Sequence, residues 1–198
     1  MALAKFSLAT VLLAVAAGSA LVAPASAAPP PPTPGASVGS KTGLPLPRYA
    51  SLKTDRVNLR EGPSKDHRTL WVFQRAGLPV EIIGEFETWR RIRDAEGTEG
   101  WVLHSLLSGR RTAIVIASKT NGKGEGKGEG KPDTTLYARA DETSGEQARL
   151  QAGVIGNVKS CTGTWCRIIV ALPQKGGDVD GYVRQERLWG VYPDEKVD

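Results

Sequence analysis

The sequence contains few side chains that could act as nucleophiles or metal ligands. Its 198 residues include two cysteines, Cys161 and Cys166, and two histidines, His67 and His104. A histidine can activate a cysteine thiolate for attack on a carbonyl group, and four such side chains can hold zinc. Both uses would require segments far apart in the chain to converge. We therefore expect no metal, no cofactor and no catalytic residue, and a hydrolase that uses Cys166 as its nucleophile is the remote alternative.

The first 27 residues have the composition of a secretory leader. Lys5 precedes an uncharged run of leucine, alanine and valine, and Ala25-Ser26-Ala27 fits the small-x-small cleavage pattern. Cleavage predicts an exported protein of the periplasm or extracellular space, without stable membrane insertion; a retained anchor is the alternative. In an exported chain with two cysteines, a disulfide between Cys161 and Cys166 is favoured over free thiols.

Two further segments lack hydrophobic periodicity and divide the rest of the chain. Residues 28–47 hold seven prolines, which predicts an extended tether, or alternatively a proline-rich ligand. Residues 118–132 are rich in alternating glycine, lysine and glutamate, which predicts a flexible linker. The glycine spacing there fits neither a P-loop nor a dinucleotide-binding loop. Two domains of about 65 residues each remain, at 48–117 and 133–198.

These two segments repeat one pattern. Trp89-Arg90-Arg91-Ile92 corresponds to Trp165-Cys166-Arg167-Ile168, and Gly100-Trp101-Val102 corresponds to Gly181-Tyr182-Val183. The same order of matches indicates one fold used twice. Short runs rich in β-branched and aromatic residues, separated by turn residues, predict strands. We therefore expect an all-β protein with two small β-barrels in tandem.

Strand alternation selects candidate ligand-binding residues. Ile92 and Ile168 are natural core residues, so Trp89, Arg91 and Trp165 should lie on the opposite, less buried face of their strands. Aromatic rings beside arginines suit a core rim or a platform for a sugar, peptide or proline-rich ligand. The candidates are Trp89, Arg91, Trp101, Trp165 and Tyr182.

The first segment carries a recognisable order of motifs. Val57-Asn58-Leu59-Arg60-Glu61-Gly62-Pro63 is followed by Ala76-Gly77, Thr88-Trp89-Arg90-Arg91-Ile92, Gly97 and Gly100-Trp101-Val102. This order resembles the bacterial SH3-like family. In the second segment the opening motif becomes Tyr137-Ala138-Arg139-Ala140-Asp141-Glu142, which keeps only Arg139. The resemblance implies two barrels of five to six strands and a non-catalytic binding role, toward peptidoglycan or toward a protein of the envelope.

The residues of the opening motif have structural uses, and ligand contact by Asn58 and Arg60 is the alternative. Gly62 and Pro63 set a turn, and Asn58 and Arg60 can donate hydrogen bonds to the loop backbone. Gly100, just before Trp101, allows a close backbone approach or a bulge.

The net charge of +5 falls to +4 without the leader, and acidic residues lie among the arginines. We therefore expect no nucleic acid partner. Two functions remain: a binding module for peptidoglycan or its peptides, and a protein-interaction adaptor.

Overall fold

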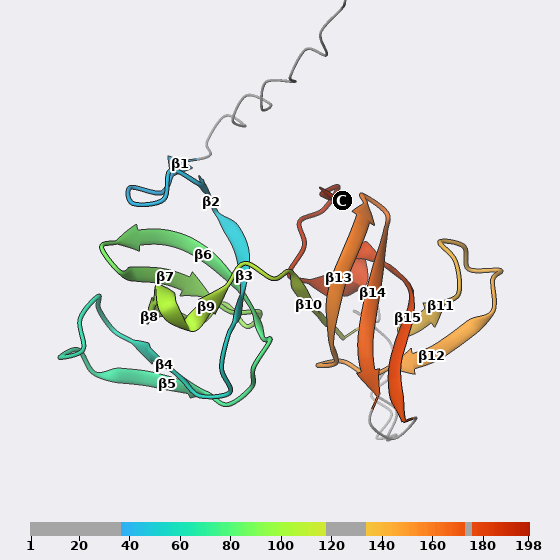
Figure 1. Ribbon diagram of the computed structural model, residues 1–198, viewed down its shortest axis with the longest axis horizontal. Coiled ribbons are helices and arrows are strands. Elements are labelled where there is room, and N and C mark those ends of the chain that lie inside the picture. Colours follow the sequence, from blue (N-terminus) through green and yellow to red (C-terminus); the bar gives the residue numbers. More distant parts are fainter. Residues whose placement is uncertain (1–36, 118–133, 173–175) are drawn as a thin grey trace, which may run out of the picture. The chain divides into compact units, whose positions relative to one another are not determined.

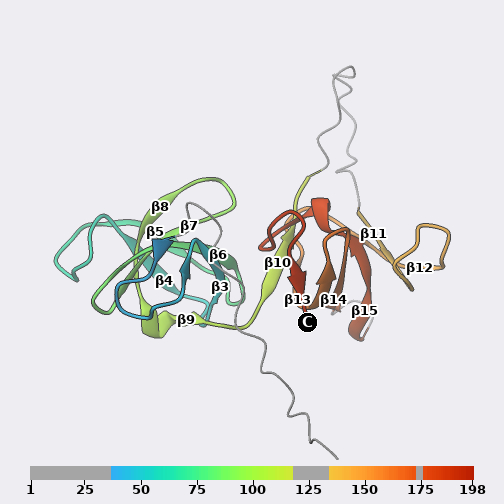
Figure 2. The ribbon, with the colours of Figure 1, turned by 90° about the horizontal axis from the view of Figure 1, so that it is seen from above.

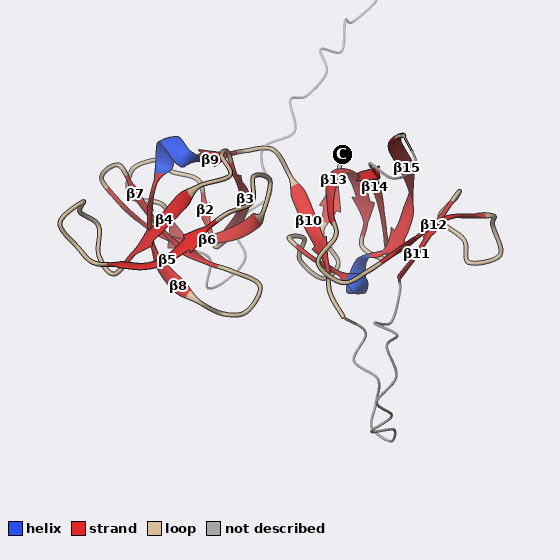
Figure 3. Cartoon of the chain, turned by 90° about the horizontal axis from the view of Figure 1, so that it is seen from below, coloured by secondary structure: helices blue, strands red, loops and turns tan. Residues whose placement is uncertain are grey.

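The computed structural model describes residues 37–117, 134–172 and 176–198 (Figure 1). These residues form two large antiparallel sheets and one small hairpin, so the all-β prediction is confirmed. Each large sheet curls around an apolar core of its own (Figures 1 and 2). Two single 3-10 turns, η1 (His104–Leu106) and η3 (Gln185–Arg187), occur within the described ranges and are drawn in blue in Figure 3.

The first sheet has seven strands in the order β5-β4-β8-β7-β6-β3-β9. Its strands are β3 (Arg48–Leu52), β4 (Val57–Arg60), β5 (Thr69–Phe73), β6 (Pro79–Phe86), β7 (Trp89–Arg93), β8 (Glu99–Leu103) and β9 (Leu107–Ser108). Alternation decides which side chains enter the core. In β4, Val57 and Leu59 are fully buried whereas Asn58 is exposed.

The second sheet repeats this order strand for strand, as β12-β11-β15-β14-β13-β10-β16. Its strands are β10 (Thr112–Val115), β11 (Thr134–Tyr137), β12 (Glu146–Leu150), β13 (Ile155–Thr162), β14 (Trp165–Leu172), β15 (Gly177–Arg184) and β16 (Leu188–Trp189), and β17 (Lys196–Val197) pairs with β13. Leu136, Ile168, Val170 and Val183 are fully buried in its core. The structure therefore contains one topology twice.

The boundary predicted between the domains is wrong for one strand. Residues 112–115 were expected in the first domain, but β10 pairs with β13 and β16 of the second sheet. The chain passes from β9 to β10 through residues 109–111 alone. The glycine-rich residues 118–132 lie outside the described residues. Because the strands on both sides of them belong to the second sheet, they fall inside the second domain and do not join the two domains.

The tether predicted over residues 28–47 is also wrong in part; residues 28–36 lie outside the described residues. β1 (Ser37–Val38) pairs with β2 (Pro45–Leu46), and Leu46 is buried in the core of the first domain. The turn of this hairpin is fastened to β6, because the backbone N–H groups of Lys41 and Thr42 donate to the Glu85 carboxylate at 2.9 and 3.0 Å. Local composition alone does not reveal a contact between residues that are 43 and 44 positions apart in the sequence.

The two domains contact one another through aromatic and polar side chains. The Tyr49 ring lies 5.1 Å from the Trp189 ring and 4.6 Å from the Tyr192 ring, measured between centroids. The Tyr192 hydroxyl donates to the buried Glu81 carboxylate at 2.9 Å. Burial, followed by the charge of Glu81, raises the pKa of Tyr49 to about 12. Burial and the hydrogen bond to Glu81 also raise the pKa of Tyr192, so both phenols are neutral at physiological pH.

Candidate functional site

A groove runs along the outer side of the first domain beside Trp89. Two adjoining cavities, of about 290 and 750 Å³, share Lys65, Trp89 and Leu103 in their walls. The loop 61–68 forms one wall, and the β6–β7 turn and η1 form the others. Trp89 and Leu103 are paired across β7 and β8. We call this feature the Trp89 groove.

The sequence shapes the loop that walls this groove. The Arg60 guanidinium donates to the backbone carbonyls of Lys65 and His67, at 2.9 and 2.8 Å. A side chain at Gly62 would collide with the His67 ring, so the loop closes there over a residue that has none. Pro63 is half-buried, and Asn58 is exposed in the groove wall. Arg60 therefore orders the loop, and its Nη1 is already occupied by these two hydrogen bonds.

The groove wall carries charges of both signs, with Asp66 and Glu87 beside Arg56 and Lys65. Arg56 and Lys65 are exposed in its wall, and neither makes an ion pair with another described residue. The neighbouring Asp66 accepts a hydrogen bond from the Ser64 hydroxyl at 2.9 Å. His104 lies at the other wall, where its Nδ1 is 3.2 Å from the Thr88 carbonyl. A carboxylate-bearing ligand would find two available cations beside an indole ring.

The structure places the other first-domain candidates on the same face of the sheet but outside the groove lining. Arg91 pairs with Trp101 across β7 and β8, and Trp101 also pairs with Arg60 of β4. The Arg91 guanidinium donates to Glu99 at 2.7 Å, and Trp101 is half-buried. Gly100 lies directly under β4, where an added Cβ would be 2.6 Å from Leu59 Cγ.

Both candidate tryptophans of the repeat are more buried than alternation predicts. Trp89 is 7% exposed and Trp165 is 9% exposed, although neither belongs to the core cluster of its domain. They lie on the face away from the core, and neighbouring side chains cover them there. In the first domain Leu103, the partner of Trp89 across β7 and β8, lines the groove together with Trp89 and Leu106.

In the second domain the corresponding surface is filled by the chain's own side chains. The Arg184 guanidinium lies 4.5 Å above the Trp165 ring, and the Tyr137 ring meets that ring edge-on at 5.7 Å. Arg184 is held there by Glu142 at 2.8 Å. Tyr182 is half-buried and pairs with Tyr137. Trp165 is thus covered by an arginine and a tyrosine of its own domain.

The strand register corrects one correspondence made from the sequence. The opening motif was aligned so that Arg139 matched Arg60. Arg60 pairs with Trp101, and Tyr137 pairs with Tyr182, so Tyr137 holds the position of Arg60. Arg139 is exposed on the loop that follows. The alignment failed because a two-residue slip between short strands leaves little trace in composition.

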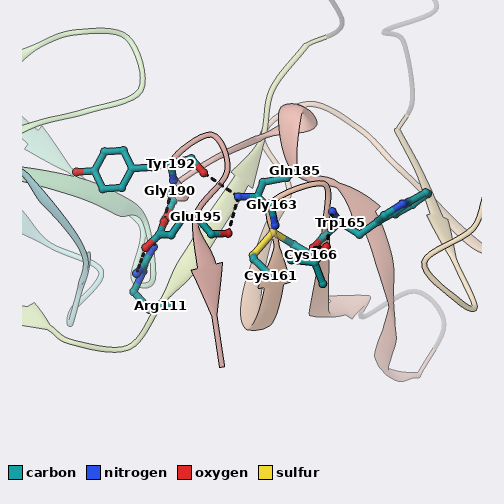
Figure 4. Close-up of a disulfide and its surroundings, with 10 residues drawn as sticks. Arg111, Cys161, Gly163, Trp165, Cys166, Gln185, Gly190, Tyr192 and Glu195 are labelled. Atoms are coloured by element: carbon teal, nitrogen blue, oxygen red, sulfur yellow. Dashed lines mark hydrogen bonds and ion pairs between the residues drawn. A yellow bond between two sulfur atoms is a disulfide. The ribbon is translucent and has the colours of Figure 1, made fainter. Parts of the chain in front are cut away.

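The predicted disulfide is confirmed. Cys161 and Cys166 face each other across β13 and β14 and are joined by a bond of 2.03 Å (Figure 4). The turn between them is tied to η3, because the Gly163 N–H donates to the Gln185 side-chain oxygen at 3.1 Å. Gln185 in turn donates to the backbone carbonyls of Tyr192 and Glu195, at 2.7 and 3.0 Å. Since both cysteines of the chain are in this bond, neither offers a thiol.

The first domain has an ion pair where the second has the disulfide. Glu85 and Arg90 face each other across β6 and β7, and the Arg90 Nε lies 3.4 Å from the Glu85 carboxylate. Arg48 and Thr42 also donate to this carboxylate, at 2.7 and 2.6 Å. Burial raises the pKa of Glu85, but these hydrogen bonds outweigh burial and lower it to about 2.

Acid should therefore weaken the first domain. A carboxyl whose folded pKa is about 2 and whose ordinary value is 4.5 stabilises the fold above pH 4.5, and this contribution is lost as the pH falls toward 2. Allowing for solvent screening, we expect a loss on the order of 1 kcal/mol. Urea unfolding between pH 6 and 3 measures it, and Glu85→Gln should flatten this dependence. Glu99→Gln, which removes the exposed partner of Arg91, is the control that should leave it in place.

Sequence reasoning missed two exposed aromatic residues, Trp71 and Phe86, and Trp71 lies in a groove. Trp71 in β5 is 60% exposed, and its neighbour Leu70 is 41% exposed. Both line an apolar groove of about 330 Å³ with Phe73 and Pro79. The run of residues 69–75 is rich in strand-forming residues, but the exposure of Trp71 depends on β5 being the last strand of its sheet. That position cannot be obtained from local patterning.

The described part of the chain contains no helix with the length and apolarity that a membrane span requires. Within the same ranges, no three His, Cys, Asp or Glu side chains are grouped so that they could hold a metal ion.

Comparisons with known proteins place the repeat in a family. No curated protein matches the sequence. Among solved structures, the chain is similar to NlpC2 and NlpC1 from Trichomonas vaginalis, at 12% and 13% identity and a TM-score of 0.30 for both. These matches cover 73% and 76% of this chain and 48% of each of those chains. An NlpC/P60 family protein from Bacillus cereus ATCC 10987 matches at 12% identity and a TM-score of 0.29, over 71% of this chain and 55% of that one. This chain thus aligns with about half the length of each of these proteins.

The sequence itself matches the family described as bacterial SH3 domain twice, over residues 53–109 and 130–190. The two matches fall on the two curled sheets and together take in more than half of the chain. The chain therefore belongs to the bacterial SH3 domain family and carries two copies of the domain in tandem.

Proposed function

We propose that this protein is a non-catalytic, exported binding protein whose first domain takes the peptide stems of cell-wall peptidoglycan in the Trp89 groove. The observation that carries the proposal is the pair of available cations, Arg56 and Lys65, beside the indole of Trp89. Stem peptides are short, carry free carboxylates and have small apolar side chains. The cations fit the carboxylates, and the Trp89–Leu103 surface fits the apolar groups.

Two further observations support this function. The predicted leader at residues 1–27 would deliver the protein to the compartment that holds the wall, and a disulfide between Cys161 and Cys166 is typical of proteins in such oxidising compartments. In the second domain Arg184 lies over the Trp165 ring, so we assign this domain a scaffold role in the proposal.

Sedimentation with purified, insoluble peptidoglycan tests the proposal. The protein should pellet with the wall, and Arg56→Ala/Lys65→Ala should weaken the apparent affinity about tenfold, because two charge-assisted contacts are lost. The matched control is Lys159→Ala/Lys196→Ala, which removes two exposed cations from the second domain and leaves the groove intact.

Competition with soluble fragments identifies which part of the wall polymer the protein binds. Stem peptides released by an amidase should displace the protein from the pellet, and the peptide-free glycan strands should not. A protein that stays in the supernatant, or an equal loss in both double variants, contradicts binding at the groove. The equal loss would indicate general charge attraction instead.

A further inference from the structure

A second apolar surface lies at the edge of the first sheet away from β9, and Ile114 of the second domain also lines it. β5 is the terminal strand of its sheet, so half of its backbone N–H and C=O groups have no partner strand. Leu70 and Trp71 project from it with 41% and 60% exposure. They line the groove of about 330 Å³ whose floor includes Phe73 and Pro79. We call this feature the Trp71 groove.

The second domain protects the equivalent edge in a way that the first does not. Because Leu59 pairs with Trp71 and Leu136 pairs with Ala148, β12 is the counterpart of β5. At the positions of Leu70 and Trp71 it has Gln147 and Ala148. β12 also carries a charged pair, with the Arg149 Nε 2.9 Å from Glu146. Charged side chains on an edge strand discourage pairing with another chain, and β5 has none between Thr69 and Phe73.

Charge indicates what covers the open edge. The rim of the Trp71 groove carries the carboxylates of Asp94 and Glu96. The occupant should therefore be an extended apolar strand with a basic residue at its end. β5 itself fits this description, because its five uncharged residues follow Arg68, whose side chain is 73% exposed and forms, among the described residues, only an exposed ion pair of 3.6 Å with Glu61.

We propose that two copies of this chain associate through β5, pairing the strands antiparallel so that each copy covers the Trp71 groove of the other. Two identical strands that pair antiparallel are related by a twofold axis, so the contact closes on a dimer and does not continue into a fibre. Each copy then supplies the partner strand that the other lacks, and Arg68 of each faces the acidic rim of the other. This association is independent of the ligand groove at Trp89.

Sedimentation equilibrium of the full chain from about 1 to about 500 µM tests the dimer. A reversible monomer–dimer equilibrium is expected. Trp71→Lys should raise its dissociation constant at least about tenfold, because it removes the largest exposed apolar side chain and places a charge on the edge. Val38→Lys is the matched control, since Val38 is 63% exposed on β1 and should leave the equilibrium unchanged.

Circular dichroism identifies any variant that fails to fold, and Leu70→Lys then provides the same test at the neighbouring position. The proposal is overturned if the chain stays monomeric over the whole range, which would assign the groove to a different protein. It is also overturned if folded Trp71→Lys and Leu70→Lys proteins dimerise as the unaltered chain does.

Discussion

Replacing Gly100 with alanine should lower the free energy of unfolding of the first domain by about 2–3 kcal/mol. The added Cβ would lie 2.6 Å from Leu59 Cγ and 2.8 Å from the carbonyl oxygen of Arg60. Neither neighbour can yield easily, since Leu59 is fully buried and the carbonyl belongs to β4. The strands β4 and β8 must therefore separate at the point where Arg60 orders the groove loop.

A chain with two domains need not unfold in one step, so the effect should be measured domain by domain. Hydrogen exchange followed on peptides from β4 and β8 reports the first domain, and peptides from β11 and β15 report the second. Gly109→Ala is the matched control, because nothing lies within 4 Å of its added Cβ. Equal protection of β4 and β8 in both variants would show that the strands accommodate the methyl group.

The second domain repeats the same close approach. A Cβ at Gly181 would lie 2.7 Å from Leu136 Cγ and 2.7 Å from the carbonyl oxygen of Tyr137. The glycine before Trp101 and the one before Tyr182 thus have one role. They let β8 approach β4 closely in the first domain and β15 approach β11 closely in the second. This contact explains why the Gly-aromatic-Val sequence recurs while the groove residues around it differ.

The fold could be predicted because its signals are local. The hairpin around Trp89 recurs around Trp165, and alternation correctly places Ile92 and Ile168 in the two cores. The domain boundary could not be predicted in this way. Residues 112–115 have the composition of a strand in either domain, and only their pairing with β13 and β16 assigns them.

The site was less accessible to sequence reasoning than the fold. Alternation places Trp89 and Arg91 on one face, but the groove also depends on the loop 61–68, which Arg60 holds by two hydrogen bonds to its backbone. Its cations, Arg56 and Lys65, lie in connections where no periodicity marks them. Trp71 was missed for a related reason, since its exposure follows from the sheet order.

The two proposals reinforce one another when the target is a polymer. A dimer joined through β5 would carry two Trp89 grooves, and a wall presents many stem peptides at high local density. Weak single contacts then combine into a stronger attachment through effective concentration. Trp71→Lys should therefore weaken attachment to the insoluble wall while leaving the affinity for a free stem peptide unchanged. Lys65→Ala, by contrast, should weaken both.

Removing the disulfide should destabilise the second domain by about 2 kcal/mol, which is the chain-entropy contribution of a crosslink that closes so short a loop. The crosslink joins residues five apart in sequence, and the change is Cys161→Ser/Cys166→Ser. Both sulfur positions are buried, so the two hydroxyls add a further cost unless they bond to each other. Cys161→Ala/Cys166→Ala separates these contributions, and urea unfolding followed by exchange at β13 and β14 measures both.

The loss should also reach the end of the chain, because β17 pairs with Cys161 and Thr162. The turn at Gly163 holds Gln185, and Gln185 holds the backbone of Tyr192 and Glu195. Exchange should therefore rise at residues 192–197 as well as in the hairpin. In the first domain the same hairpin position is held by Glu85 and Arg90, so chemical reduction of the unaltered chain should leave β6 and β7 protected. If reduction exposed β6 and β7 as much as β13 and β14, the disulfide would be supporting both domains and not the second alone.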